Sequence, residues 1–231
     1  MGDVFAEAYR LWLMRSLEQR LHDTGFGRVA GVDEAGRGCL AGPVTAAAVV
    51  VGEGPLVPGI DDSKKVPPAR RERLAVAVRR AHPVHAVVHV APQEIDRINI
   101  LRATRRAMVT ALAKLRPRPG VAVVDAVALE APMRTLSVVR GDQISYAVAC
   151  ASILAKTTRD AAMRVLHRRF PHYAFDENKG YGSAAHREAL ERHGPCEAHR
   201  LTFRSVVPTR DRGTPRRAAG RRPGDHLART G

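Results

Sequence analysis

Acidic side chains directly follow two apolar runs of this sequence. Residues 29–32 (VAGV) lead into Asp33 and Glu34, and residues 121–124 (VAVV) lead into Asp125. A carboxylate at the end of a buried strand loses hydration, which costs on the order of several kcal/mol unless a positive group neutralises it. Two such strand ends side by side would gather three acids, and carboxylates without His or Cys suit hard cations such as Mg²⁺ or Mn²⁺.

An ordinary explanation competes with this one, because an aspartate at a strand end often only begins a turn. We favour a functional role for the pair Asp33 and Glu34 and leave both explanations open for Asp125. Neighbouring strand residues point to opposite faces, so the pair can serve one site only if the strand twists or ends there. Gly36 and Gly38 favour such an ending.

A fourth acid, Asp142, precedes a predicted long helix. An aspartate at that position usually caps the helix N-terminus, and its spacing alone does not make it a metal ligand.

Glycines, lysines and one tyrosine surround these acids. The run Gly36-Arg37-Gly38 lets backbone N–H groups approach a ligand closely, although a tight turn needs glycine equally. The loop 61–65 (DDSKK) offers one hydroxyl and two ammonium groups for phosphates, or is a solvated loop. Tyr181 lies between glycines and is either exposed for stacking or packed at a helix edge. The motif GxxxxGK[ST] is missing, which excludes a P-loop nucleotide triphosphatase.

The hydrophobic pattern predicts the elements that must position these residues. It indicates an α/β domain with a mixed sheet, because the first two strands are too closely linked for a helical crossover. The predicted strands are 28–32, 44–51, 84–90, 121–124 and 135–139, and the predicted helices are 4–22, 69–80, 94–115, 143–170 and 183–193. In the first helix, the apolar positions are Phe5, Leu11, Met14, Leu17 and Leu21.

Composition limits the class of protein. The 231 residues are 45% hydrophobic, as in globular domains, and no run is apolar enough for a membrane span or a signal peptide. Three dispersed cysteines (Cys39, Cys150, Cys196) exclude a disulfide framework and fit a reducing cytoplasm. The net charge of +15 favours a polyanionic partner such as nucleic acid, or reflects an arginine-rich proteome.

Part of this charge lies in the last residues of the chain. Residues 209–231 carry seven arginines and two aspartates, a net charge of +5, with Leu227 as the one large apolar residue. Such a segment buries too little apolar surface to offset its chain entropy, so we predict disorder. It either adds salt-sensitive attraction to phosphates or has no role.

Six blocks of residues together resemble one protein family. Residues 29–50 (VAGVDEAGRGCLAGPVTAAAVV) closely resemble the signature of bacterial ribonuclease HII, of the type 2 ribonuclease H family. The similarity continues through 62–65 (DSKK), 99–104 (NILRAT), 141–160 (GDQISYAVACASILAKTTRD), 179–182 (KGYG) and 199–203 (HRLTF). The resemblance implies a ribonuclease H-like fold, a central mixed five-stranded sheet flanked by helices, with additional C-terminal helices. It divides the chain into an N-terminal helix (1–26), a catalytic domain (27–207) and a disordered Arg-rich tail (208–231).

The resemblance also implies residue roles. Asp33, Glu34, Asp125 and Asp142 match four acids that are catalytic and hold two divalent cations, Mn²⁺ or Mg²⁺, so Asp142 becomes a ligand as well as a possible cap. The other matches are nucleic-acid contacts: a loop that senses a 2′-hydroxyl (Gly36, Arg37, Gly38), a tyrosine that stacks on a deoxynucleotide sugar (Tyr181), and positions near backbone phosphates (Ser63, Lys64, Ser152, Lys156).

The implied activity is cleavage of the RNA strand of RNA–DNA hybrids and cleavage on the 5′ side of ribonucleotides embedded in duplex DNA. The implied protein is a cytoplasmic monomer with no membrane contact and no required protein partner. Type HIII relatives carry an extra domain before the acid pair, and the 32 residues here favour type HII. Three residues depart from the family pattern without removing a matched acid: Cys39, Ala126 and Asn178.

Two other functions remain as alternatives. One is a nuclease of the same fold that acts on a different substrate, such as a junction resolvase. The other is a nucleic-acid-binding protein without catalysis, against which the full set of strand-end acids argues.

Overall fold

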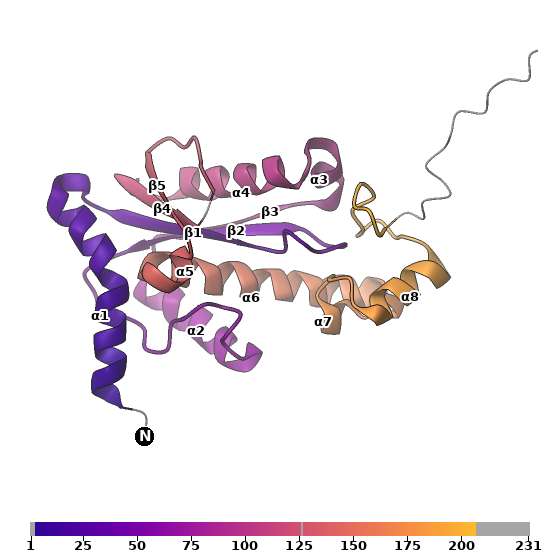
Figure 1. The fold of residues 1–231 in the computed structure, drawn as a ribbon, viewed down its shortest axis with the longest axis horizontal. Coiled ribbons are helices and arrows are strands. Elements are labelled where there is room, and N and C mark those ends of the chain that lie inside the picture. The colour runs from indigo at the N-terminus through magenta and orange to yellow at the C-terminus, as the bar shows by residue number, and fades with distance from the viewer. Residues whose placement is uncertain (1–2, 126, 207–231) are drawn as a thin grey trace, which may run out of the picture.

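Short β-branched and alanine-rich runs form the centre of the molecule. The computed structural model describes residues 3–125 and 127–206, and its sheet has the strand order β3-β2-β1-β4-β5 (Figure 1). β1 pairs antiparallel with β2, and β2 with β3, whereas β1–β4 and β4–β5 are parallel. The sheet is therefore mixed, as predicted. The strands are β1 (Val29–Ala35), β2 (Val44–Val51), β3 (His85–Val90), β4 (Val121–Asp125) and β5 (Arg134–Val138).

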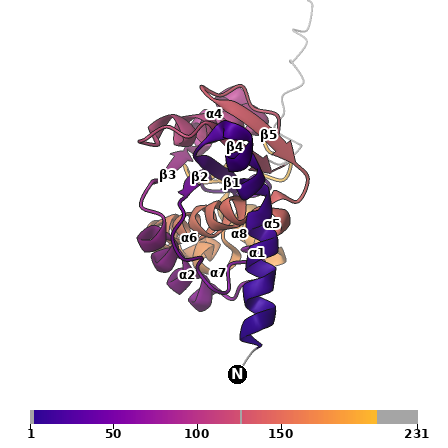
Figure 2. The same ribbon diagram turned by 90° about the vertical axis from the view of Figure 1, so that its left-hand side faces the viewer.

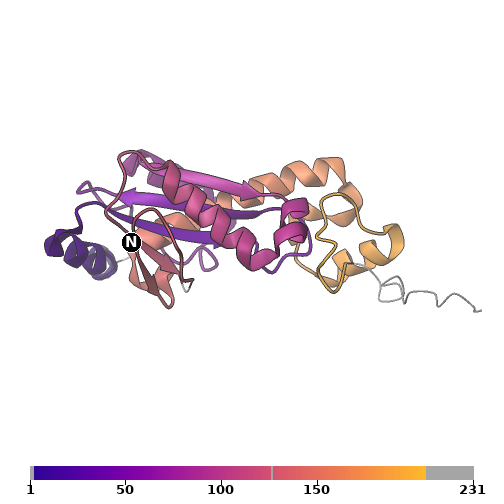
Figure 3. The same ribbon diagram turned by 90° about the horizontal axis from the view of Figure 1, so that it is seen from above.

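Helices cover both faces of this sheet (Figures 1 and 2). One face packs on α6 (Tyr146–Arg169), with α2 (Pro68–Ala81) beyond it. The other face packs on α4 (Ile100–Lys114), preceded by α3 (Pro92–Ile98). Figure 3 shows α4 crossing above the strands. Because both faces are covered, every residue of β2 is buried, which explains its continuous apolar sequence.

The first strand is longer than predicted. β1 does not end before the acids; it continues through Asp33 and Glu34 to Ala35, and the last pair of its ladder joins Ala35 to Thr45 of β2. The pairs Asp33–Ala47 and Glu34–Ala46 come before it and also hold this end of β1 in the sheet. The acids therefore lie within a strand, not after it.

Two of the predicted helices are each split in two. The predicted helix 94–115 is broken at Asn99, whose φ of 67° is incompatible with a helix and whose side chain accepts the Arg102 N–H to begin α4. The predicted helix 143–170 is broken at Ser145, whose extended backbone separates α5 (Gly141–Ile144) from α6. The Ser145 hydroxyl caps α6 by accepting the Val148 N–H.

The N-terminal helix α1 (Val4–Leu21) forms as predicted but buries only one of its faces. Leu11 and Met14 pack under the sheet beside α6, whereas Phe5 is 87% exposed, so its assignment to the buried face was wrong. Within the described residues, no helix is long and apolar enough to cross a membrane.

The C-terminal part adds the expected helices beyond the sheet. They are α7 (Phe175–Asn178) and α8 (Ala184–His193), and α8 ends at Gly194 with a φ of 69°. They surround a separate apolar cluster that includes Tyr173 and Phe175. The predicted tail 208–231 and the departure at Ala126 lie outside the described residues.

Candidate active site

Asp33 and Glu34 occupy the end of β1, the strand at the centre of the sheet. Asp33 is 7% exposed, and its Oδ1 accepts the Glu34 N–H at 2.7 Å. Glu34 accepts a hydrogen bond from Arg37 Nη1 at 3.3 Å. Since the two acids are neighbours in a strand, their side chains leave the backbone on opposite sides. Glu34 contacts Arg37 of the loop that follows, whereas Asp33 is buried.

Asp125 comes to the same edge from the neighbouring strand. The parallel register places Val32 beside Val124, so the strand ends that carry Asp33 and Asp125 reach the same level. Asp125 Oδ1 accepts the Gly141 N–H at 2.8 Å, which ties the end of β4 to the start of α5. This contact follows from the parallel topology, which brings carboxyl ends of strands to one edge.

Asp142 joins this edge from the first turn of α5. Its side chain is 7% exposed, and the charge of Asp125 acts on it. The expected role as the cap of the long helix was wrong, because Ser145 caps α6 and the residue before α5 is Arg140 in a left-handed conformation. Asp142 therefore has no capping role that would explain its type.

Burial and mutual repulsion raise the pKa values of three of these acids. Burial raises the pKa of Asp33 well above its usual range, and the charges of Glu34 and Asp125 raise it further. Burial also raises the pKa of Glu34, against the lowering effect of Arg37. The pKa of Asp142 is raised by burial, then by Asp62 and Asp125. The charge of Asp125 thus acts on each of the other three acids.

This donor set fits a hard divalent cation in its chemistry. Every donor is a carboxylate oxygen. The raised pKa values of Asp33, Glu34 and Asp142 mean that their ionised forms are destabilised, and a bound cation would stabilise those forms. Within residues 3–125 and 127–206, no three His, Cys, Asp or Glu side chains already stand close enough to hold an ion. The metal role of these acids stays a prediction.

Sequence reasoning missed Asp62 as a member of this acidic group. Its side chain is 8% exposed and raises the pKa of Asp142 by charge and by a hydrogen bond. Its carboxylate Oδ1 also accepts the Lys64 N–H at 2.9 Å, and the Lys64 charge lowers the pKa of both Glu34 and Asp142. The sequence feature that could have pointed to Asp62 is its position directly before Ser63 and Lys64, two residues assigned to phosphate contacts.

The loop 36–38 leaves β1 directly beside Glu34. Gly36 has a φ of 91°, and a Cβ there would lie 1.9 Å from Arg159 Nε, so both its conformation and its surroundings require glycine. Gly38 differs, because a Cβ built there has no atom within 4 Å. Arg37 is exposed apart from its contact with Glu34. The open side of Gly38 leaves room for a ligand to approach the backbone.

Tyr181 lies on a second loop that contacts the first. Its side chain is 47% exposed, its ring centroid is 5.9 Å from Lys156 Nζ, and its hydroxyl interacts with the buried Cys39 thiol. The N–H groups of Leu40 and Ala41 both donate to Gly180 O, at 2.8 and 3.3 Å. Tyr181 is therefore exposed, and the two loops are joined through their backbones.

The residues expected near phosphates form a partly buried network. The hydroxyls of Ser63 and Ser152 are 2.8 Å apart, and both side chains are buried. Lys156 Nζ donates to Asp160 at 2.7 Å, and Lys64 is exposed. The two lysines remain near the surface, whereas the two serines hydrogen-bond to each other.

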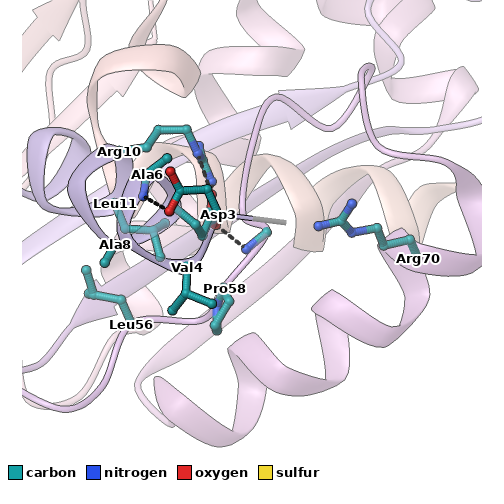
Figure 4. A pocket seen from close by; sticks show the side chains of 11 residues that line it. Asp3, Val4, Ala6, Ala8, Arg10, Leu11, Leu56, Pro58 and Arg70 are labelled. Atoms are coloured by element: carbon teal, nitrogen blue, oxygen red, sulfur yellow. Dashed lines mark hydrogen bonds and ion pairs between the residues drawn. The ribbon is translucent and has the colours of Figure 1, made fainter. Parts of the chain in front are cut away.

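A separate cavity lies away from these acids. Its volume is about 890 Å³, and it opens between the N-terminal half of α1 and the loop 56–59 (Figure 4). Val4, Leu11, Leu56 and Pro58 form its apolar wall, with Arg70 at the rim. None of the four predicted catalytic acids lines it.

Most of this chain matches one protein family. The family model described as Ribonuclease HII matches residues 30–206, which include all four acids and both loops. The chain belongs to the ribonuclease HII family. Ribonucleases HII are hydrolases that act on phosphodiester bonds, so this protein is a nuclease.

Individual relatives agree with this family. A ribonuclease HII from Caldanaerobacter subterraneus subsp. tengcongensis is 43% identical over 198 residues, 85% of this chain and 82% of that protein. One from Chlamydia trachomatis serovar A is 47% identical over 190 residues, 82% of this chain and 88% of that protein. Among solved structures, the ribonuclease H2 of Pyrococcus horikoshii OT3 superposes with a TM-score of 0.67 at 27% identity, covering 78% of this chain and 95% of that one. The ribonuclease H-like fold is confirmed.

Proposed function

We propose that this ribonuclease HII family member cleaves the RNA strand of RNA–DNA hybrids and cuts 5′ of ribonucleotides embedded in duplex DNA. The reaction leaves a 3′-hydroxyl and a 5′-phosphate. The observation that carries the proposal is that the charge of Asp125 acts on Asp33, Glu34 and Asp142, with Glu34 hydrogen-bonded to Arg37 of the loop 36–38. Carboxylates supply the chemistry and the loop supplies recognition of the sugar.

Four carboxylates would hold two divalent cations, Mn²⁺ or Mg²⁺, in this reaction: Asp33, Glu34, Asp125 and Asp142. When bound, such cations activate water at neutral pH and stabilise the charge on a leaving oxygen. The protein fixes the carboxylates by backbone contacts, since Asp125 accepts the Gly141 N–H and Asp33 accepts the Glu34 N–H. These bonds orient the acids before any ligand arrives, which limits the reorganisation that the reaction requires.

The two loops would distinguish RNA from DNA. A 2′-hydroxyl is the sugar group that differs, and the backbone N–H groups of residues 36–38 can approach it because Gly38 faces open space. Arg37 would contribute from the same loop. Tyr181, exposed and next to Lys156, would stack on the sugar of the adjoining deoxynucleotide.

Backbone phosphates would be held by the adjoining polar residues. Lys64 and Lys156 provide ammonium groups near the surface. Ser63 and Ser152 would contribute their hydroxyls, which lie 2.8 Å apart. These contacts set the register of the strand but do not distinguish the sugar.

The test uses a DNA duplex with one embedded ribonucleotide. We expect a single cut 5′ of the ribonucleotide in Mg²⁺ or Mn²⁺, no cut in EDTA, and no cut of the matched all-DNA duplex. Asp33→Asn should abolish cleavage and keep most of the binding. Asp23→Asn is the matched control, because Asp23 is an exposed acid after α1, and it should cleave as the wild type does.

Three outcomes would contradict parts of this proposal. Cleavage of a four-way DNA junction without ribonucleotides would indicate a junction resolvase. Metal-independent binding without any cleavage would indicate a protein that only binds nucleic acid. Full cleavage by Asp33→Asn would remove that acid from the reaction.

A further inference from the structure

The segment 198–200 runs beside the loop that follows β1. Arg200 N–H donates to Leu40 O at 2.9 Å, Gly42 N–H donates to Ala198 O at 2.8 Å, and Ala41 forms an isolated β-bridge with His199. Residues about 160 positions apart in sequence are therefore joined as a short strand pair. This pair adjoins both loops that the proposed function uses, because Arg200 contacts the loop 36–38 and Leu40 also donates to Gly180 O.

Arg200 holds the loop 36–38 through its carbonyls. Its guanidinium donates to Gly36 O at 2.7 Å, to Arg37 O at 2.8 Å and to Gly42 O at 2.9 Å. The side chain is fully buried, and burial lowers its pKa to about 10, so it stays charged at neutral pH. Among the described residues no carboxylate forms an ion pair with it. A buried guanidinium whose partners are only carbonyls carries a large desolvation cost. This cost favours a role for Arg200 in function rather than in stability alone.

His199 holds the second loop through a chain of hydrogen bonds. Cys196 N–H donates to His199 Nδ1 at 3.0 Å, so the proton of His199 lies on Nε2. His199 Nε2 then donates to His186 Nε2 at 3.0 Å, and His186 Nδ1 donates to Tyr181 O at 2.8 Å. Both rings are neutral, since burial lowers the pKa of His199 to about 4 and also lowers that of His186. The chain ends on the backbone of the exposed tyrosine.

We propose that the adjacent residues His199 and Arg200 are positioning residues that hold the loop 36–38 and Tyr181 as one rigid recognition unit. This inference rests on the proposed function and extends it. Arg200 fixes the carbonyls of the loop, so that its N–H groups point outward toward the sugar. His199 fixes the carbonyl of Tyr181 through His186. These two side chains act together with the backbone bonds to Gly180 O and with Arg159, which donates to Lys179 O at 2.9 Å and to Ala41 O at 3.2 Å. Together they set the spacing between the contact to the ribonucleotide and the contact to the deoxynucleotide.

The first test measures discrimination between sugars. Dissociation constants are measured in EDTA for a duplex with one ribonucleotide and for the matched all-DNA duplex, and kcat and KM are measured in Mg²⁺. Arg200→Lys keeps the charge but cannot reach three carbonyls. Discrimination is the dissociation constant of the all-DNA duplex divided by that of the ribonucleotide duplex, and we expect this ratio to fall about tenfold or more. KM should rise, and kcat should change much less.

A matched variant separates this effect from a general loss of stability. Arg10→Lys changes another arginine that donates to a backbone carbonyl, Ile60 O at 2.7 Å, on α1. It should leave the ratio unchanged. A merely structural role for Arg200 would weaken binding of both duplexes equally and keep the ratio constant, and that result would overturn the proposal.

The second test concerns the other arm of the unit and does not require Arg200→Lys to fold. His199→Gln should reduce the same ratio, and in a Tyr181→Ala background it should reduce the ratio no further, because its effect passes through Tyr181. If the two substitutions lower the ratio additively, His199 does not act through Tyr181.

Amide hydrogen exchange gives a readout that does not depend on activity. In Arg200→Lys or His199→Gln, the amides of Leu40 and Gly42 should exchange faster than in the wild type, since they donate to Gly180 O and Ala198 O. If the wild type cleaves neither substrate, the proposed function fails while this measurement still tests the rigid unit. Unchanged exchange in folded variants would overturn it.

Discussion

Asp33 combines burial with two neighbouring negative charges. Its side chain is 7% exposed, and the charges of Glu34 and Asp125 add to the desolvation that raises its pKa. An ionised Asp33 at neutral pH is therefore unfavourable in the folded chain without a cation. A buried carboxyl group with a strongly raised pKa is typical of a functional site.

We expect Asp33→Asn to stabilise the protein in EDTA while it abolishes cleavage. Asn keeps the Oδ1 that accepts the Glu34 N–H but removes the charge. The melting temperature should therefore rise, because the variant no longer buries a charge beside Glu34 and Asp125. Thermal unfolding of both proteins in EDTA measures it, with Asp23→Asn as the control. A lower melting temperature of the variant would contradict the repulsion.

His82 makes the stability of the protein depend on pH. It is buried below the sheet, its Nε2 is 3.2 Å from the Tyr146 hydroxyl, and burial lowers its pKa to about 4. In the unfolded chain the pKa is about 6.5. The unfolded state therefore binds the proton first, so the stabilisation is complete above pH 6.5 and is lost as the pH falls toward 4.

We expect His82→Gln to be less sensitive to acid than the wild type. Between pH 7 and pH 5, the wild type should lose roughly 1–2 kcal/mol of unfolding free energy that the variant does not lose. Urea denaturation at the two pH values measures this difference. His22→Gln, at an exposed histidine, should follow the wild type. Parallel losses in wild type and His82→Gln would show that His82 does not take up the proton.

At the scale of elements, the contact between β1 and α6 fixes the position of the acids. A Cβ at Gly31 would lie 2.1 Å from Ala147 C and 2.2 Å from Val148 N, and both are backbone atoms of α6. The strand that carries Asp33 thus touches the helix without any side chain between them. Neither backbone can move without disturbing the sheet or the start of the helix.

We therefore expect Gly31→Ala to cost about 3 kcal/mol or more of unfolding free energy. The added methyl group must push β1 away from α6, and cleavage by the folded fraction should also fall because Asp33 moves with the strand. Chemical denaturation gives the loss. Gly52→Ala is the matched control, because no atom lies within 4 Å of a Cβ there. A loss below about 1 kcal/mol at Gly31 would show that the strand and helix separate easily.

The same elements show what the sequence could predict. Strands β1, β2 and β4 were predictable because their β-branched and alanine-rich runs are largely buried, whereas β3 and β5 were predicted although they are more exposed. The continuation of β1 through Asp33 and Glu34 was not, because it depends on pairing with β2 across the sheet. The helix breaks were also missed, since Asn99 and Ser145 are compatible with a helix until their capping bonds are seen.

The candidate site was predictable to a different extent. Strand-end position predicted Asp33 and Glu34, and the resemblance to ribonuclease HII added Asp125 and Asp142; in the structure the charge of Asp125 acts on Asp33 and Glu34. Asp62 and Arg200 were not predicted. Their importance arises from burial against residues far away in sequence, which no local pattern encodes.

At the scale of the whole molecule, a basic protein carries an acidic edge. The net charge is +15, of which residues 209–231 contribute +5 from seven arginines and two aspartates. The remaining +10 belongs to residues 1–208, which contain the acids of the site. Long-range attraction to a polyanion and local repulsion of phosphate by carboxylates therefore occur in the same chain, and each contributes a different part of binding.

We expect removal of residues 209–231 to weaken binding without changing where the substrate is cut. The last described residue, Val206, is buried in the C-terminal apolar cluster, so this truncation leaves the described fold intact. Each arginine that neutralises a phosphate contributes about 0.9 to the slope of log Kd against log salt. The slope should therefore decrease by roughly 1–5, equally for all-DNA duplex and duplex with one ribonucleotide.

Fluorescence anisotropy in EDTA over a series of salt concentrations measures this slope, and a full-length variant with the seven arginines replaced by serine should match the truncation. An unchanged slope would assign all phosphate attraction to residues 1–208, and a change confined to the ribonucleotide duplex would mean that the removed residues take part in sugar recognition.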